Sequence, residues 1–172
     1  MTGRRHALLA AAFGLIVPCT AVAQRIQVAA GDTAAKTVSV VEFRLCIPAE
    51  TSDCGAWVDR VVDLAGDGDA AMPPAIRALR APNGRDSLWI ENGAVRIRAT
   101  AAAQPRTFVV RVAQGTAVAL AASGDQRYAF ALVDPPPGHS GGSTIVMIDL
   151  ERHSVVDSFG SRTRFTGIAM VR

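Results

Sequence analysis

Residues 138–142 have the strongest resemblance to a catalytic motif, since Gly-His-Ser-Gly-Gly fits the G-x-S-x-G pattern of a hydrolase nucleophile. That chemistry needs a strained turn from a strand into a helix, which exposes the serine beside a histidine and an oxyanion hole. Here a proline-rich loop precedes the motif, and a strand-like run, 144–148, follows it. We therefore interpret the motif as a flexible loop. Its residues Pro137, His139 and Ser140 are candidates for ligand contact and not for catalysis.

A second candidate is the acidic run that contains Asp63, Asp67 and Asp69, whose oxygens could surround Ca²⁺. The order of an EF-hand loop requires a glutamate at its twelfth position, which counted from Asp63 is Pro74. The chain also has no glycine-rich phosphate loop and no His/Cys cluster. We expect a solvated loop here, with no metal and no cofactor.

Three aromatic side chains could stack on a sugar ring: Trp57, Trp89 and Tyr128. Aromatic residues make up only 5% of the chain, so core packing is the better use for Trp89 and Tyr128. Trp57 follows Cys54 closely and is expected to cover a disulfide. His153 is expected to be a surface turn residue.

The first 23 residues have the layout of a secretory signal peptide. Arg4 and Arg5 form a basic start, an apolar run of 11 residues (7–17) follows, and Ala21 and Ala23 form an A-x-A cleavage site. The run is too short to span a bilayer, which needs about 20 apolar residues. We therefore expect a periplasmic or secreted protein without a stable membrane anchor. The choice between Sec and twin-arginine export stays open.

Charge and composition exclude some classes of protein and of binding partner. The chain is 49% hydrophobic and 19% charged, which excludes a disordered protein. Cleavage after Ala23 removes Arg4 and Arg5 and lowers the formal charge from +3 to +1. No basic run with interleaved aromatic residues remains, so we expect no nucleic-acid partner. A protein or a small molecule is the expected partner.

Cleavage would also leave two cysteines, Cys46 and Cys54, at the ends of a polar loop. An even number of cysteines in an exported protein is best interpreted as a disulfide. The spacing is neither C-x-x-C nor a metal-ligand pattern. We expect a disulfide that joins the two ends of a hairpin loop.

The remaining chain, 24–172, is predicted to be one all-β domain. Val41, Phe43 and Leu45 point one way, while Glu42 and Arg44 point the other. Val95, Ile97 and Ala99 alternate with Arg96 and Arg98, as in a strand with one solvated face. Glycine and proline recur about every ten residues. Twelve short β segments follow from this pattern.

One hairpin in this pattern is especially well defined. Residues 87–90 and 94–100 are joined through Asn92-Gly93, a dipeptide that accepts the positive φ angles of a tight turn. A turn at Ser123-Gly124-Asp125 is predicted to separate a further pair of strands.

The strands repeat along the chain. Residues 61–66 (Val-Val-Asp-Leu-Ala-Gly) recur at 155–160 as Val-Val-Asp-Ser-Phe-Gly, and 116–120 recurs 50 residues later at 166–170. A second offset, between Leu79 and Leu120, is 41 residues. Periods of 40 to 50 residues with about four strands each are typical of β-propeller blades.

The order of segments within one repeat carries a family resemblance. Segments 117–120, 127–131, 144–150, 154–157 and 166–169 follow one another through turns. They resemble one unit of the YVTN-type β-propeller repeat, which has the approximate order G-I-A-V, S-P-D-G-R, Y-V-A-N, T-V-S-V-I-D, G-K-V-V. The resemblance is best over 116–171, weaker over 75–115 and marginal over 25–66.

This resemblance implies antiparallel four-stranded blade-like units that form a partial β-propeller. Propellers have four to eight blades, whereas the chain has about three units. An open β-meander or a β-sandwich is therefore the alternative fold.

The function that we expect is a non-enzymatic exported binding or scaffold module, with contact surfaces in loops 135–143 and 47–53. One alternative is a propeller-type hydrolase or lactonase, or an accessory subunit of an exported dehydrogenase. Another is a truncated or self-associating propeller fragment that forms a homo-oligomer.

Overall fold

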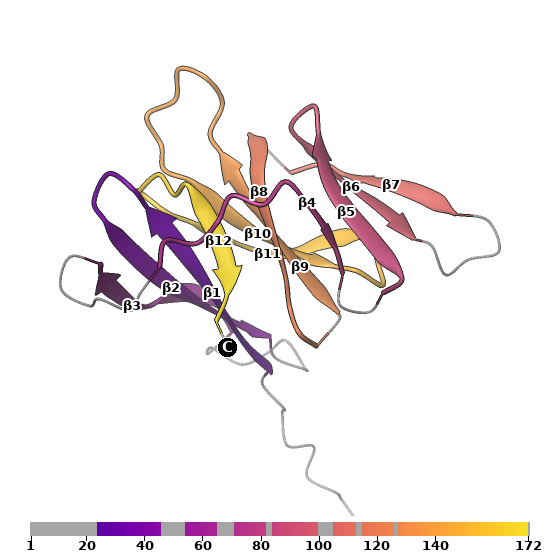
Figure 1. Cartoon of the computed structure of the whole chain (residues 1–172), viewed down its shortest axis with the longest axis horizontal. Helices are drawn as coiled ribbons and strands as arrows, with labels where there is room; N and C mark the ends of the chain where they lie inside the picture. The colour runs from indigo at the N-terminus through magenta and orange to yellow at the C-terminus, as the bar shows by residue number, and fades with distance from the viewer. Residues whose placement is uncertain are drawn as a thin grey trace, which may run out of the picture.

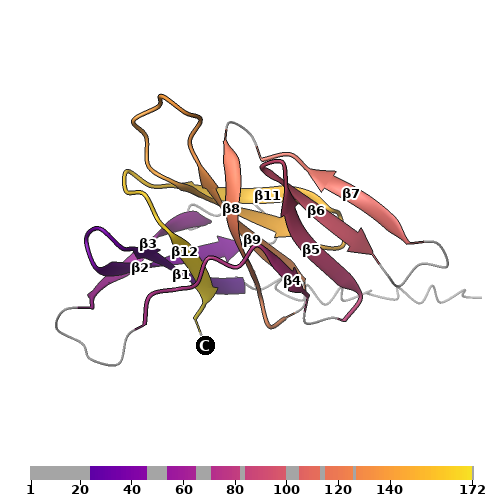
Figure 2. The ribbon, with the colours of Figure 1, turned by 45° about the horizontal axis from the view of Figure 1, so that its top comes forward.

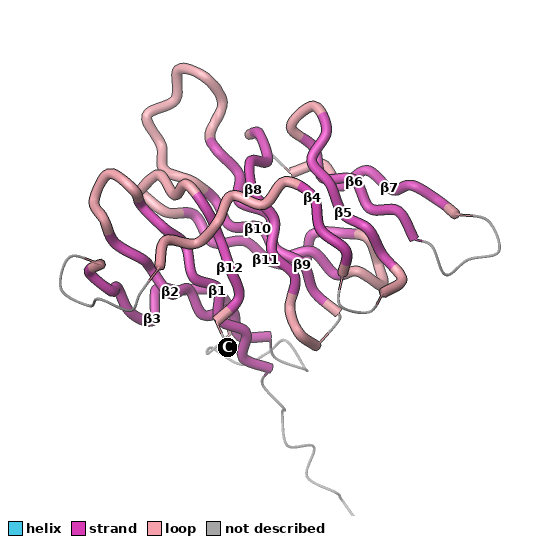
Figure 3. Tube along the Cα trace, viewed as in Figure 1, coloured by secondary structure: helices cyan, strands magenta, loops and turns pink. Residues whose placement is uncertain are grey.

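A computed structural model describes residues 24–45, 54–64, 71–81, 84–99, 105–112, 115–125 and 127–171. Several predictions fall outside these residues: the signal peptide with Ala21 and Ala23, Cys46, the loop 47–53, and Asp67 with Asp69. Within the described residues the chain forms twelve strands and no helix (Figure 3), so it contains no helix able to cross a membrane. The all-β prediction is confirmed.

The strands form three antiparallel sheets of four strands each, and none of the sheets closes on itself (Figure 1). The first sheet has the order β12-β1-β2-β3, the second β4-β5-β6-β7 and the third β11-β10-β9-β8. Their bounds are β1 (Gln24–Asp32), β2 (Thr37–Leu45), β3 (Gly55–Asp63), β4 (Ala78–Arg80), β5 (Asp86–Glu91), β6 (Ala94–Ala99), β7 (Arg106–Val110), β8 (Thr116–Ala122), β9 (Tyr128–Asp134), β10 (Thr144–Asp149), β11 (Ser154–Gly160) and β12 (Gly167–Met170).

Tight turns set the hairpins in the second and third sheets. Asn92 and Gly93 have φ of 52° and 74° and join β5 to β6, as the sequence predicts. Ser123, Gly124 and Asp125 turn the chain from β8 toward β9. The local signals for these turns are sufficient because each hairpin needs only a few residues with special backbone angles.

The third sheet lies between the other two (Figures 1 and 2) and has a hydrophobic core on each side. Along β9, Tyr128, Phe130 and Leu132 face the first sheet, whereas the alternate alanines 129 and 131 face the second sheet. The large side chains pack against β1, β2 and β12, with the rings of Phe43 and Phe130 5.2 Å apart. Burial on both faces explains why β9 is almost wholly apolar.

The two ends of the described chain meet in the first sheet. β12 pairs with β1 through Val28–Met170 and Gly31–Gly167, so the last strand supplies one edge of the sheet that β1 to β3 begin. Pro73 and Pro74 pass against Gly167, where a Cβ atom would overlap their backbone. Pro73 and Pro74, which precede the second sheet in the chain, are thus packed onto this edge.

Cys54 directly precedes β3, and Arg44 near the end of β2 lies opposite Gly55 at its start. This register brings Leu45 and Cys54, the described residues on either side of 46–53, to the same end of the first sheet. The pairing of Cys46 with Cys54 remains a prediction, because Cys46 lies outside the described residues.

Two aromatic predictions have different outcomes. Tyr128 is buried in the core between the first and third sheets, as predicted. The prediction for Trp89 is wrong: its neighbours Leu88 and Ile90 enter the core, so alternation places the half-buried Trp89 on the opposite side of the second sheet.

His153 is in a turn, as predicted, but it is not simply a surface residue. It has a φ of 52° between β10 and β11, and its ring stacks on Phe108 of β7 with the centroids 3.8 Å apart. This stack links the second and third sheets.

Candidate functional site

The serine-containing loop between β9 and β10 presents the residues of the G-x-S-x-G motif to solvent. Pro137, His139 and Ser140 are all exposed. The backbone of this stretch has a structural role, since the carbonyl of His139 accepts a hydrogen bond from Arg164 at 3.2 Å and its N–H donates to the carbonyl of Pro136 at 3.1 Å. The three residues remain candidates for ligand contact.

The anchoring serine of this loop is Ser143, which the sequence pattern does not single out. It is fully buried, its hydroxyl donates to Asp134 at 3.0 Å, and the same oxygen accepts from the Phe165 amide at 3.0 Å. Ser143 therefore fixes the base of the loop against the turn that leads into β12.

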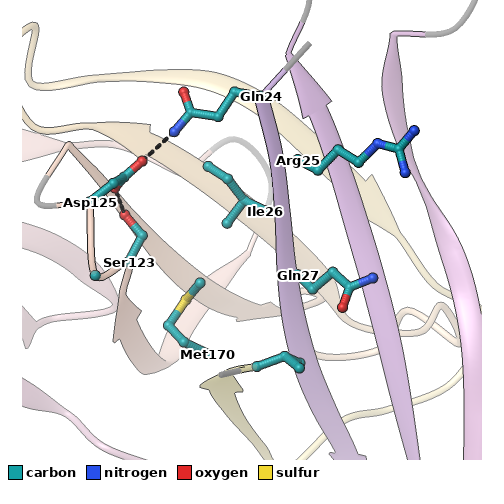
Figure 4. A pocket seen from close by; sticks show the side chains of 9 residues that line it. Gln24, Arg25, Ile26, Gln27, Ser123, Asp125 and Met170 are labelled. Atoms are coloured by element: carbon teal, nitrogen blue, oxygen red, sulfur yellow. Dashed lines mark hydrogen bonds between the residues drawn. The ribbon is translucent and has the colours of Figure 1, made fainter.

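A cavity of about 220 Å³ lies at one end of the contact between the first and third sheets (Figure 4). It is formed by three segments that are far apart in the sequence. These are the start of β1, the turn after β8 and the end of β12, which contribute Gln24, Arg25, Ile26, Gln27, Ser123, Gly124, Asp125, Met170 and Val171.

Strand alternation decides what β1 presents to this cavity. The side chains of Gln24 and Ile26 point toward the Ser123–Asp125 turn, whereas Arg25 and Gln27 point to the other face of the first sheet (Figure 4). The cavity thus has an apolar floor of Ile26 and Met170 and a polar rim of Gln24 and Asp125.

Asp125 organises that rim. Its carboxylate accepts hydrogen bonds from the Gln24 amide and the Ser123 hydroxyl, and from the backbone N–H of Arg127 at 3.2 Å. The exposed turn is thereby tied to β1, and a carboxylate is held at the mouth of the cavity. Carboxylates bind ligand hydroxyl or ammonium groups, because an ionised carboxylate only accepts hydrogen bonds.

Behind the cavity, Glu42 of β2 is the centre of a second polar cluster. Its carboxylate accepts from Arg44 at 3.0 Å and from Gln27 at 3.3 Å, and Arg25 lies 3.9 Å away. Desolvation raises the pKa of Glu42, but the hydrogen bonds from Arg44 and Gln27 and the attraction of Arg25 outweigh it and hold the pKa below its usual value. Glu42 is therefore a charged anchor and not a proton donor at neutral pH.

The same cluster positions an aromatic ring. The Arg44 guanidinium lies over the ring of Trp57, 4.8 Å from its centroid, in a cation–π contact. Glu42 fixes Arg44, and Arg44 in turn covers Trp57. Whether Trp57 also covers a disulfide, as the sequence suggests, remains a prediction.

Sequence reasoning missed most of this site. The alternation in β2 correctly separates Glu42 from Val41 and Phe43, but it does not indicate that Glu42 is only 5% exposed. The Ser123-Gly124-Asp125 turn is predicted from local residues, yet its partner Gln24 is 101 residues away. No local signal in a single sequence reports such a contact.

The described residues contain no group of three His, Cys, Asp or Glu side chains that could hold a metal ion. The sequence matches no protein-family model and no curated protein.

Proposed function

We propose that the protein is a non-enzymatic binding module of propeller-like architecture, exported by its N-terminal signal. The observation that carries this proposal is the cavity at Gln24 and Asp125, where three distant segments converge on an apolar floor with a polar rim. Ligand sites of soluble proteins commonly combine such a floor with a few fixed polar groups. Loop residues Pro137, His139 and Ser140 are a further contact surface in this proposal.

Connectivity supports the propeller-like part of the proposal. The second and third sheets are four-stranded antiparallel meanders, and β1 to β3 form a three-stranded meander in the first sheet. The last strand of one meander is followed in the chain by an edge strand of the next sheet, as in β3 to β4 and β7 to β8. The last such step, from β11 to β12, returns to the first sheet. The last strand, β12, thus completes the sheet that β1 begins, as expected of a propeller-like chain whose two ends share one blade.

The rim chemistry favours a small ligand that carries hydroxyl or ammonium groups, since Asp125 and the Gln24 carbonyl oxygen can accept hydrogen bonds. The test uses galactose, arginine and spermidine as probes at millimolar concentration. At least one should raise the melting temperature of the wild-type protein, and Asp125→Asn should reduce this shift. Equal shifts for Asp125→Asn and the wild type would contradict the proposal.

A second candidate function, assembly through self-association, is favoured by a specific observation. The outer strands β3, β7 and β11 each carry exposed valines: Val58, Val61, Val109, Val155 and Val156. Exposed apolar edge strands are templates for pairing with another chain.

A further inference from the structure

The outer face of the second sheet, opposite the third sheet, combines one indole ring with a set of arginines. Leu88, Ile90, Val95 and Ile97 point into the core. Alternate residues must therefore point outward. We name as the Trp–Arg face Arg80, Ser87, Trp89, Arg96, Arg98 and Val109, with Glu91 on the same side at the end of β5.

Strand register places these side chains side by side. Trp89 lies opposite Arg96, which lies opposite Val109, in one row across the sheet. Arg80 and Arg98 flank Ser87 in the next row. Neighbouring strands are about 4.8 Å apart, so the backbone positions of Arg80 and Arg98 are separated by roughly 10 Å, with the small Ser87 between them.

The arginines on this face retain free hydrogen-bond donors. Arg98 is exposed and has no ion-pair or hydrogen-bond partner among the described residues. Arg80 donates to the carbonyl of Gly84 at 2.9 Å, and Arg96 pairs with Glu91 at 2.8 Å. A guanidinium has five N–H donors, so each of these arginines can still bind an anion.

We propose that the Trp–Arg face binds an acidic polysaccharide, with a sugar ring stacked on Trp89 and carboxylates paired with Arg96, Arg98 and Arg80. Arginine matches a carboxylate in a two-pronged geometry, and the partly exposed indole offers a flat apolar surface. Repeated carboxylates along a polymer fit repeated arginines along the rows. This surface is separate from the cavity at Asp125.

A single-stranded nucleic acid is also anionic and stacks on aromatic rings, but its binding surfaces use successive aromatic residues. The Trp–Arg face has one such residue. The expected export of the protein also brings it to polysaccharides of the cell surface. An acidic polysaccharide is therefore the ligand that fits this face.

The test uses fluorescence, because the chain has two tryptophans and Trp57→Phe leaves Trp89 as the only reporter. Polygalacturonate should change the Trp89 emission of this variant, neutral dextran should not, and added salt should weaken binding. For the wild-type protein, immobilised polygalacturonate should bind about tenfold more weakly to Trp89→Leu and to Arg98→Gln.

Two controls test whether weaker binding is specific to the Trp–Arg face. Arg162→Gln removes the same charge from an exposed turn and should leave the affinity unchanged. Circular dichroism verifies that the variants are folded. Any of three results would overturn the proposal. These are binding of dextran equal to that of polygalacturonate, an unchanged affinity in both Trp89→Leu and Arg98→Gln, and tighter binding of a thymidine 20-mer than of polygalacturonate.

Discussion

At the scale of single residues, the buried carboxylate of Glu42 shows how a strand can hold a charge inside the first sheet. Arg44, Gln27 and Arg25 together compensate for its lost hydration. Removing one partner of such a cluster leaves the others unsatisfied and costs more than the hydrogen bond itself contributes.

Glu42→Gln should lower the free energy of unfolding by about 1–3 kcal/mol at pH 7. The folded-state pKa of Glu42 lies below the usual 4.5, so the charged form stabilises the fold above pH 4.5. This contribution is lost as the pH falls through the folded-state pKa. In urea denaturation, the difference in free energy of unfolding between the wild type and Glu42→Gln should therefore decrease from pH 7 to pH 3. A difference that does not depend on pH would contradict this role of Glu42.

The two serines near the G-x-S-x-G motif should respond in opposite ways to alanine. Ser143→Ala removes a buried hydroxyl that bonds Asp134 and the Phe165 amide, and should cost about 1–3 kcal/mol of stability. Ser140→Ala removes an exposed hydroxyl and should change stability by less than about 0.5 kcal/mol. Thermal denaturation of both variants measures the difference in stability. A marked loss of stability in Ser140→Ala would contradict the assignment of Ser143 as the residue that anchors the loop.

At the scale of elements, local patterns predict the strands well. Alternation in β2 and the Asn92-Gly93 turn identify their elements because the cause lies within a few neighbouring residues. Alternation does not say which face of β5 packs against another sheet, which is why the core position predicted for Trp89 is wrong. The pairing of β12 with β1 depends on residues about 140 positions apart, beyond the reach of any local pattern.

β12 should stabilise the fold far beyond its four residues, because it completes the first sheet and packs against the third. Ile168 on this strand is fully buried, and Ile168→Ala should cost about 2–5 kcal/mol. The matched control, Val156→Ala on the exposed outer strand β11, should cost less than about 1 kcal/mol. Similar losses in both variants, measured by chemical denaturation, would show that β12 does not hold the sheets together.

At the scale of the whole molecule, the outer strands of the three sheets carry exposed valines. Val61 on β3 is 60% exposed on an edge strand. Lysine on an edge strand is a natural means of preventing strand pairing. The repeat pattern predicts the sheets but not how many chains share one assembly, because outer edges can pair with any matching strand.

If the edges mediate self-association, light scattering of the wild-type protein should show a mass that rises with concentration. Val61→Lys should shift this equilibrium toward the single chain, whereas Thr163→Lys in an exposed turn should not. A wild-type mass equal to one chain at every concentration would rule out assembly as the function.

The central claim, binding without catalysis at the cavity beside Asp125, is tested most directly by nuclear magnetic resonance of the ¹⁵N-labelled protein titrated with galactose, arginine and spermidine. We predict that one probe shifts the amide signals of Gln24, Ile26, Ser123 and Asp125 while its own spectrum shows no product over time. Asp125→Asn should weaken this binding about tenfold, and Glu151→Gln should not. Conversion of a probe, or the absence of shifts at these residues with all three, would contradict the account.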